Sequence, residues 1–270
     1  MKMNKIIFFD IDGTLIGRSF ALTEKNKQAI QKLRENGHLV FLSTGRPLSY
    51  IENEILDIGF DGIVASAGGT IYYQGQCIYE CPLDLKTLKK AIKVLREYEI
   101  PYGLECKDYY YTGFDLINKT IAKQIGIGQD KDIVINKFNQ VKYKDVQYFN
   151  FDNPVSKLSG MILNEKQYEI LIKNLSDDFK IVRYDFAIDI IQKKWNKGDG
   201  AKYIMEYLGI DFQNSMAYGD SLNDLEIMKV VACPIVYEKA PQELLNIAVD
   251  TFIDPDQDGI YHSLKKLELI

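Results

Sequence analysis

Four aspartates in this chain stand where apolar runs of the sequence end. Asp10 and Asp12 follow the run Ile6–Phe9, and Asp220 and Asp224 follow a second such run far along the chain. Carboxylates that crowd together repel one another unless a cation lies between them. Oxygen ligands with room left for substrate and water are typical of Mg²⁺ sites. The four aspartates therefore predict a magnesium site, provided that the fold brings them together.

Three further residues have the chemistry to hold a phosphate group. Thr44 offers a hydroxyl and a backbone amide as donors, and Gly45 lets the backbone approach a ligand closely. Lys197 precedes an expected helix and carries a mobile cation suited to phosphate oxygens. Carboxylates, a cation site and phosphate donors together indicate chemistry on a phosphate ester.

The elements that must position these residues alternate between strands and helices. The short apolar runs Ile6–Phe9, 39–42 and 215–218 are typical of strands buried on both faces. Thr23 is suited to cap a helix that follows the first run, and Gly37 is suited to end it. This alternation predicts an α/β, doubly wound, Rossmann-like parallel sheet, whose strand ends meet along one edge.

The pattern changes in the middle of the chain. Residues 83–186 combine helical and strand-like pieces, including an expected strand at 147–151, whereas 129–145 fits neither pattern well. We therefore expect an α+β cap domain at 83–186, inserted into a core made of 1–82 and 187–270.

Composition excludes several classes of function. The formal net charge of −5 and the absence of a long Lys/Arg run argue against nucleic-acid binding. No apolar run approaches the ~20 residues of a membrane span or the length of a secretory signal core. The four cysteines form no CxxC pair, so we expect reduced thiols in a cytoplasmic protein.

Four segments resemble, in order, the four motifs of the haloacid dehalogenase superfamily of phosphatases. They are 9–15, 43–47, 197–198 and 219–224. The Thr-Gly-Arg form of the second motif, the long insert and the closing Asp258-Gly259-Ile260 resemble the Cof-type branch, which has a C2-type cap. One departure is the segment 65–69, Ala-Ser-Ala-Gly-Gly, where Cof-type sequences usually carry Asn-Gly. That departure puts in doubt any substrate contact expected from this loop.

The resemblance implies a role for each matching residue. Asp10 would be the nucleophile that forms an aspartyl phosphate, and Asp12 would act as general acid and then general base. The metal would be held by Asp10, the backbone carbonyl of Asp12 and Asp220, while Asp224 would orient a metal-bound water. The residues expected to hold the phosphoryl oxygens are Thr44, Gly45, Lys197 and Asn223.

The sequence thus predicts a Mg²⁺-dependent phosphatase acting on a small phosphorylated metabolite. Sugar phosphates and phosphorylated cofactors both fit the resemblance, and the expected cap would close over the site and supply specificity. Two alternatives stay open at this stage. One is a phosphotransferase or phosphomutase that uses the same aspartyl phosphate, and the other is a non-catalytic metabolite-binding module. Neither the substrate nor the oligomeric state follows from the sequence.

Overall fold

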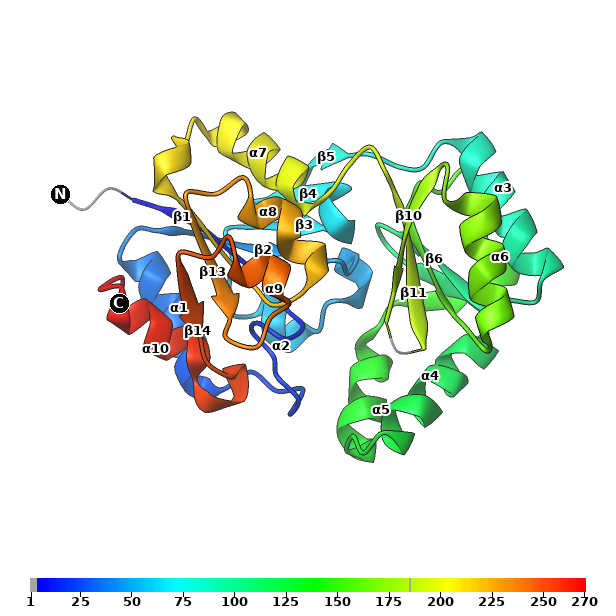
Figure 1. Cartoon of the computed structure of the whole chain (residues 1–270), viewed down its shortest axis with the longest axis horizontal. Helices are drawn as coiled ribbons and strands as arrows, with labels where there is room; N and C mark the ends of the chain where they lie inside the picture. Colours follow the sequence, from blue (N-terminus) through cyan, green and yellow to red (C-terminus); the bar gives the residue numbers. More distant parts are fainter. Residues whose placement is uncertain (1–3, 185) are drawn as a thin grey trace. The chain divides into compact units, whose positions relative to one another are not determined.

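Two β-sheets organise the chain, one in each of two structural units. The computed structural model describes residues 4–184 and 186–270 (Figure 1). The first unit, the core unit, comprises residues 4–45, 53–79 and 196–270. The second, the insert unit, comprises Arg46–Glu52 and Glu80–Trp195.

The core unit contains an eight-stranded sheet whose strand order is β14-β13-β12-β1-β2-β3-β4-β5. The strands are β1 (Ile6–Phe9), β2 (Leu39–Ser43), β3 (Gly62–Ala65), β4 (Thr70–Tyr73), β5 (Gln76–Glu80), β12 (Ser215–Gly219), β13 (Cys233–Tyr237) and β14 (Asp250–Phe252). The helices are α1 (Glu24–Glu35), α2 (Asn53–Leu56), α7 (Lys197–Leu208), α8 (Leu225–Met228), α9 (Gln242–Leu245) and α10 (Gly259–Lys266). The six strands from β14 to β3 run parallel, and β4 runs antiparallel to β3.

Burial on both faces explains why the central strands are continuously apolar. All four residues of Ile6–Phe9 are fully buried between β12 and β2. Helix α1 packs against α10, and α7 packs against α8; Figure 1 shows these two pairs on opposite sides of the sheet. The hydroxyl of Thr23 accepts a hydrogen bond from the Asn26 amide and caps α1, as expected. The predicted doubly wound parallel-sheet fold is confirmed.

The insert unit contains a six-stranded sheet with helices packed on it, in strand order β10-β11-β9-β6-β7-β8. The strands are β6 (Tyr102–Cys106), β7 (Tyr110–Thr112), β8 (Tyr143–Asp145), β9 (Val155–Met161), β10 (Phe179–Arg183) and β11 (Ala187–Gln192). The helices are α3 (Leu85–Glu97), α4 (Phe114–Gly126), α5 (Lys131–Gln140) and α6 (Glu165–Leu175). Neighbouring strands are antiparallel except for β7 and β8, which are parallel. This is the predicted α+β architecture.

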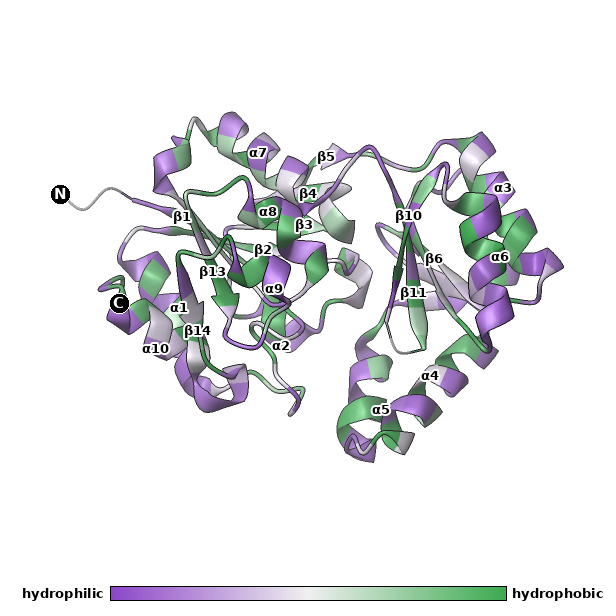
Figure 2. Cartoon of the chain, in the orientation of Figure 1, coloured by the Kyte–Doolittle hydropathy of each residue, from purple (hydrophilic) through white to green (hydrophobic). Residues whose placement is uncertain are grey.

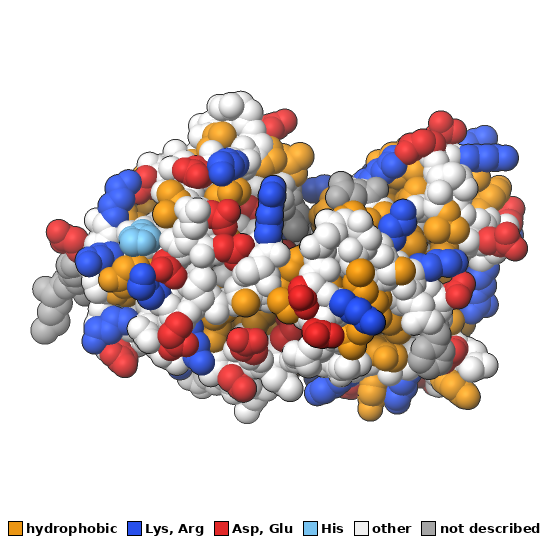
Figure 3. Space-filling view, turned by 90° about the horizontal axis from the view of Figure 1, so that it is seen from below, with side chains coloured by type: hydrophobic (Ala, Val, Ile, Leu, Met, Phe, Trp, Pro, Cys, Tyr) orange, Lys and Arg blue, Asp and Glu red, His pale blue; other side chains and the backbone are white. Residues whose placement is uncertain are grey.

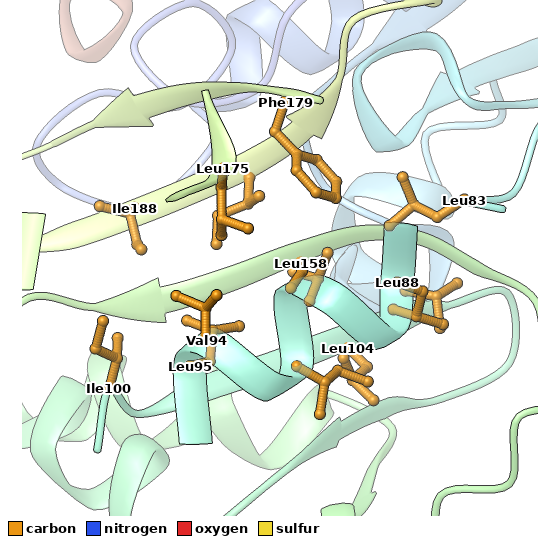
Figure 4. Close-up of a cluster of buried hydrophobic side chains, with 14 of the residues drawn as sticks. Leu83, Leu88, Val94, Leu95, Ile100, Leu104, Leu158, Leu175, Phe179 and Ile188 are labelled. Carbon is orange, nitrogen blue, oxygen red and sulfur yellow. The ribbon is translucent and has the colours of Figure 1, made fainter. Parts of the chain in front are cut away.

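Helices α3 and α6 bury one face of this sheet. Figure 2 shows hydrophobic and hydrophilic residues along both helices, and the buried residues of α3 recur at the spacing of one helix face. Figure 4 shows Leu88 of α3 in one cluster with Leu104 and Leu158 of the strands. The carboxylate of Asp84 accepts a hydrogen bond from the Thr87 amide and so caps α3.

The structure differs from the sequence expectations in several elements. Pro47 would suit the first turn of a helix, but the segment after it holds only a 3₁₀ turn, Leu48–Tyr50, and the short α2. The expected strand at 147–151 is a 3₁₀ helix, Val146–Tyr148, followed by a turn. Strand β11 lies in the insert unit, whereas the expected domain boundary falls just before it.

Helices α4 and α5 had no counterpart among the sequence expectations. The region 129–145, which fitted neither pattern, holds α5 and β8. Among the described residues, no helix combines the length and the apolar character that a membrane crossing needs. Figure 3 shows acidic and basic side chains interspersed over one face of the molecule, without a continuous basic surface there.

Candidate active site

Three parallel strands bring the candidate residues of the core unit to one sheet edge. Strand β1 lies between β12 and β2, in the register Phe9 opposite Tyr218 and Leu42. The residues that follow these strands, Asp10, Asp220 and Thr44, therefore leave the sheet at its carboxyl edge, where open α/β sheets bind ligands.

Lys197 joins two of the aspartates. Its Nζ lies 2.6 Å from Asp10 Oδ1 and 2.7 Å from Asp224 Oδ1. It also donates to Asn223 Oδ1 at 3.4 Å. The Lys197 side chain is only 1% exposed, so these charge-assisted hydrogen bonds are shielded from water. Asp10 and Lys197 are 187 positions apart in the sequence, and the fold makes them neighbours.

Asp220 completes a group of three carboxylates. One oxygen of each of Asp10, Asp220 and Asp224 lies within 4.8 Å of the others. Thr14 Oγ1 donates to Asp220 Oδ1 at 3.2 Å. Gly13 has a φ of +86°, and a Cβ built there would lie 2.3 Å from Asp220 Oδ2, so only glycine fits beside this carboxylate.

Burial and mutual repulsion perturb the ionisation of the group. Burial, with Asp224 and Asp12 nearby, raises the pKa of Asp10 to about 7 against the opposing pull of Lys197. Burial, with Asp10 and Asp224, raises the pKa of Asp220 to about 9. Burial alone would lower the pKa of Lys197, but Asp10 and Asp224 together raise it above its ordinary value. Lys197 therefore stays charged, but its single positive charge is too little to keep all three carboxylates ionised.

The charge count and the donor set both fit a divalent cation. When all three carboxylates are ionised, they and the ammonium sum to −3 + 1 = −2, the charge that one Mg²⁺ would balance. Carboxylate oxygens are also the hard ligands that Mg²⁺ prefers. The carboxylates of Asp10, Asp220 and Asp224 are the described side chains that could hold it.

Local capping fixes the orientation of Lys197 and Asp224. Lys197 is the first residue of α7, whose start is held by a capping box between Asn196 and Asp199. Asp224 Oδ2 accepts hydrogen bonds from the amides of Asp220 and Ser221 at 3.1 and 3.2 Å. Its other oxygen is thereby turned toward Lys197. The Ser221 contact was not anticipated, although the spacing Ser-x-x-Asp is a capping-box signal.

The loop that departs from the Cof-type pattern is conformationally unusual. Ser66, Ala67 and Gly68 all have positive φ, at 51°, 55° and 99°. The Ala67 amide donates to the carbonyl of Thr44 at 3.0 Å, and the Thr44 amide donates to the carbonyl of Val64 at 2.8 Å. Left-handed non-glycine residues cost energy and concentrate at functional sites. The loop thus braces the backbone at Thr44.

Asp12 and Asn223 lie at the rim of the site. Asp12 is exposed, and its carboxylate is not one of the three grouped acids. The metal ligand expected from Asp12 is its backbone carbonyl and not its carboxylate. Asn223 is half-buried and also accepts from Ser221 Oγ at 2.9 Å. Thr14 was missed among the candidates, although it stands directly beside Gly13 in the first motif.

Known proteins resemble the chain along almost its whole length. The family model of haloacid dehalogenase-like hydrolases matches residues 7–264. Phosphatase YwpJ of Bacillus subtilis (strain 168) is 23% identical over 292 residues, which cover 97% of this chain and 99% of YwpJ. The 5-amino-6-(5-phospho-D-ribitylamino)uracil phosphatase YitU of the same strain is 22% identical over 280 residues, covering 97% and 96% of the two chains. The structure of the HAD subclass IIB sugar phosphatase BT4131 has a TM-score of 0.79 at 20% identity, covering 99% of this chain and 100% of its own.

Proposed function

The chain belongs to the haloacid dehalogenase-like hydrolases, and we propose that it hydrolyses a small phosphorylated metabolite through an aspartyl phosphate at Asp10. One observation carries this proposal. The Asp10 carboxylate stands at the carboxyl end of β1, held by the Lys197 ammonium at 2.6 Å within a group of three acids. A nucleophile so placed has a cation beside it that can hold and polarise the phosphate of an ester.

The first half-reaction transfers the phosphoryl group to the protein. An Asp10 carboxylate oxygen forms a bond to phosphorus, and the bond from phosphorus to the substrate oxygen breaks. The carboxyl group of Asp12 donates a proton to the departing oxygen, so that the product leaves as an alcohol. Asp12 suits this mobile role because it lies exposed at the rim, two residues from Asp10.

The second half-reaction regenerates Asp10. The Asp12 carboxylate accepts a proton from a water molecule, whose oxygen then bonds to phosphorus. The bond from phosphorus to the Asp10 oxygen breaks, which releases inorganic phosphate and restores both carboxyl groups to their starting states.

Fixed donors would hold the phosphoryl oxygens during both steps. We assign this role to Lys197, Asn223, and the Thr44–Gly45 segment that the 66–68 loop braces. Phosphoryl transfer depends mainly on positioning and on stabilising charge. The Lys197 ammonium, held in place by Asp10 and Asp224, is well suited to both tasks.

The metal that fits this site is Mg²⁺. We assign its ligands to the carboxylates of Asp10 and Asp220 and the backbone carbonyl of Asp12, with Asp224 orienting a water. Bound Mg²⁺ would supply charge neutralisation for the phosphate and the three acids.

We further propose that the insert unit is the cap that selects among substrates, and that the protein acts in the cytoplasm. YitU, as its name states, acts on a phosphorylated ribityl compound, and BT4131 is a sugar phosphatase. Both relatives are thus named for substrates with a hydroxylated chain or ring, which supports sugar or polyol phosphates as the first substrates to examine.

The test is phosphate release from an aryl phosphate with Mg²⁺, with EDTA, and with Asp10→Asn. We expect EDTA to abolish turnover, and Asp10→Asn to lower it by at least roughly a thousandfold, since it removes the nucleophile. Asp57→Asn, on an exposed residue of the same unit, is the matched control and should leave turnover unchanged. Robust turnover by Asp10→Asn would rule out the covalent route.

A further inference from the structure

The segment that follows Asp12 is held in place by a carboxylate from the far end of the chain. Asp256, in the 3₁₀ turn Pro255–Gln257, accepts two hydrogen bonds from Ser19. The Ser19 amide donates to Oδ2 at 3.0 Å, and the Ser19 hydroxyl donates to Oδ1 at 2.6 Å. Both oxygens of this carboxylate therefore act on one residue, which lies 237 positions away in the sequence. We call this pair of hydrogen bonds the Asp256 clamp.

Close packing restricts the turn that carries Ser19. A Cβ built on Gly17 would lie 2.5 Å from the carboxylate carbon of Asp256, so this carboxylate rests directly against the Gly17 backbone. The Phe20 amide donates to the Gly17 carbonyl at 3.2 Å and closes the turn. The Asp256 clamp thus holds the backbone from Gly17 to Phe20 as one piece.

The turn begins directly after Ile16, the residue that sets the path of the chain at Asp12. The Gly13 amide donates to the Ile16 carbonyl at 2.8 Å, and the Ile16 amide donates to the Ile11 carbonyl at 3.0 Å. Asp12 and Ile16 also form an isolated parallel β-bridge. The residues on both sides of Asp12 are thus hydrogen-bonded to Ile16, so a shift of Ile16 would carry Asp12 with it.

The turn that carries Asp256 is firmly anchored. The fully buried Asn26 of α1 donates from Nδ2 to the Pro255 carbonyl at 2.9 Å and accepts from the Tyr261 amide at 3.0 Å. Asp254 Oδ1 accepts from the Asp256 amide at 3.0 Å. Asp256 is therefore held by α1 and α10, which pack against each other (Figure 1).

The Asp256 clamp lies where it adds little to overall stability. Ser19 is exposed and Asp256 is half-buried, so water competes for both hydrogen bonds. What the clamp does fix is the distance between the anchored turn and the loop that carries Asp12. The position of the Asp12 carboxyl group follows the path of this loop, so the clamp acts on the placement of a functional group.

We propose that Asp256 is a positioning residue for the general acid and base of the reaction. This inference rests on the proposed function, in which Asp12 donates a proton to the departing oxygen and later accepts one from water. By holding Ser19, Asp256 keeps Ile16, and with it the carboxyl group of Asp12, in the place where the proton is transferred. A displacement of about 1 Å in such a group can lower a rate by roughly 100-fold.

The test compares substrates that differ in their need for an acid. The para-nitrophenolate ion leaves phosphorus without a proton, whereas the oxygen of an alkyl phosphate needs one as it departs. Values of kcat/KM are measured at saturating Mg²⁺ for para-nitrophenyl phosphate and for the sugar or polyol phosphate that the wild type hydrolyses fastest. For Asp256→Ala we expect the alkyl value to fall by roughly 10-fold to 100-fold and the aryl value by less than about 3-fold. A general loss of folded protein would lower both values alike.

Two further variants separate position from charge and from stability. Asp256→Asn can still accept from the Ser19 amide and donate to the Ser19 hydroxyl, so the ratio of the two kcat/KM values should stay within about 3-fold of wild type. Asp250→Asn is the matched control, because Asp250 is a carboxylate of the same unit that pairs with Lys266 at 2.8 Å and not with the turn at Ser19. It should leave the ratio unchanged.

A second measurement does not depend on turnover. Hydrogen exchange of the Gly13 and Ile16 amides is followed by NMR in the full-length protein. We expect Asp256→Ala to speed exchange at both amides by roughly 10-fold, and Asp250→Asn to leave it unchanged. If Asp256→Ala leaves the kcat/KM ratio of an active protein unchanged, the proposal is overturned, whatever the exchange rates. If the wild type hydrolyses no phosphate, the proposed function fails instead, and unchanged exchange would show that Asp256 does not order the Asp12 loop either.

Discussion

Replacing Lys197 by methionine probes the electrostatics of the candidate active site most directly. Methionine retains much of the length of the lysine stem and removes the ammonium that lies 2.6 and 2.7 Å from Asp10 and Asp224. The substitution thus removes the buried cation that lies against two of the three grouped carboxylates. Removing one partner of a buried ion pair costs about 3–5 kcal/mol, because the other charge stays buried.

Protonation offsets part of that cost, and the direction of the pH dependence follows. In the wild type, burial already raises the folded-state pKa of Asp10 to about 7, well above its unfolded value. Without Lys197 this pKa rises further, so the folded variant binds a proton that the unfolded chain releases. Between about pH 9 and about pH 7, the loss of stability should therefore shrink by up to roughly 1.4 kcal/mol per pH unit as the pH falls.

The assay is urea unfolding followed by circular dichroism, in EDTA, across that pH range. Lys202→Met makes the same chemical change on an exposed residue of the same helix and should alter the unfolding free energy by less than about 0.5 kcal/mol. If Lys197→Met lowers the free energy of unfolding by less than roughly 1 kcal/mol at every pH, then Lys197 does not offset the charge of buried carboxylates.

Three other substitutions test separate features. Gly13→Ala should lower the free energy of unfolding by roughly 1–2 kcal/mol, because φ is +86°. It should also raise the Mg²⁺ concentration needed for phosphate release, because the new Cβ would crowd Asp220. An unchanged Mg²⁺ requirement would contradict the assignment of Asp220 as a metal ligand. Ala67→Gly should stabilise the protein to urea by about 1 kcal/mol, since φ is 55°. Ala29→Gly, inside α1, should destabilise it by a similar amount. If both substitutions destabilise the protein equally, the backbone at Ala67 is not strained. Burial raises the pKa of Glu105 to about 7, which means that its own contribution to wild-type stability should fall by roughly 3 kcal/mol as pH rises from about 4.5 to about 7. Glu105→Gln should flatten that slope in urea midpoints, and an unaltered slope would show that Glu105 does not titrate there.

The core unit could be predicted well because its signals are local and agree with one another. The run Ile6–Phe9 has to be a buried strand, and the acids that follow such runs must lie at one edge of a parallel sheet. The resemblance to haloacid dehalogenase-like phosphatases is confirmed by the family match and by the phosphatase relatives. What the sequence could not supply was side-chain geometry, such as the position of Lys197 between Asp10 and Asp224.

Helices α4 and α5 of the insert unit were harder to predict because their residue types favour a helix only weakly. Helix α4 contains β-branched residues and ends at Gly126, and α5 mixes Ile133, Val134 and Ile135 with polar residues. Such residues favour helices weakly, so tertiary packing decides their conformation. The expected strand at 147–151 failed for the opposite reason. Its aromatic residues suit a strand, but Asp145 caps a 3₁₀ turn instead by accepting from the Gln147 amide.

The strand order of the core sheet has a consequence for how the chain folds during its synthesis. Strand β1 is made first, yet one of its two neighbours is β12, which pairs Ser215 with Ile6. At ribosomal rates of roughly 5–20 residues per second, β1 waits for tens of seconds with one edge unpaired. Meanwhile residues 80–195, a contiguous stretch that contains every strand of the second sheet, can emerge and fold. The segment that follows residue 195 is therefore the one that closes the central sheet and, with Asp220 and Asp224, completes the carboxylate group.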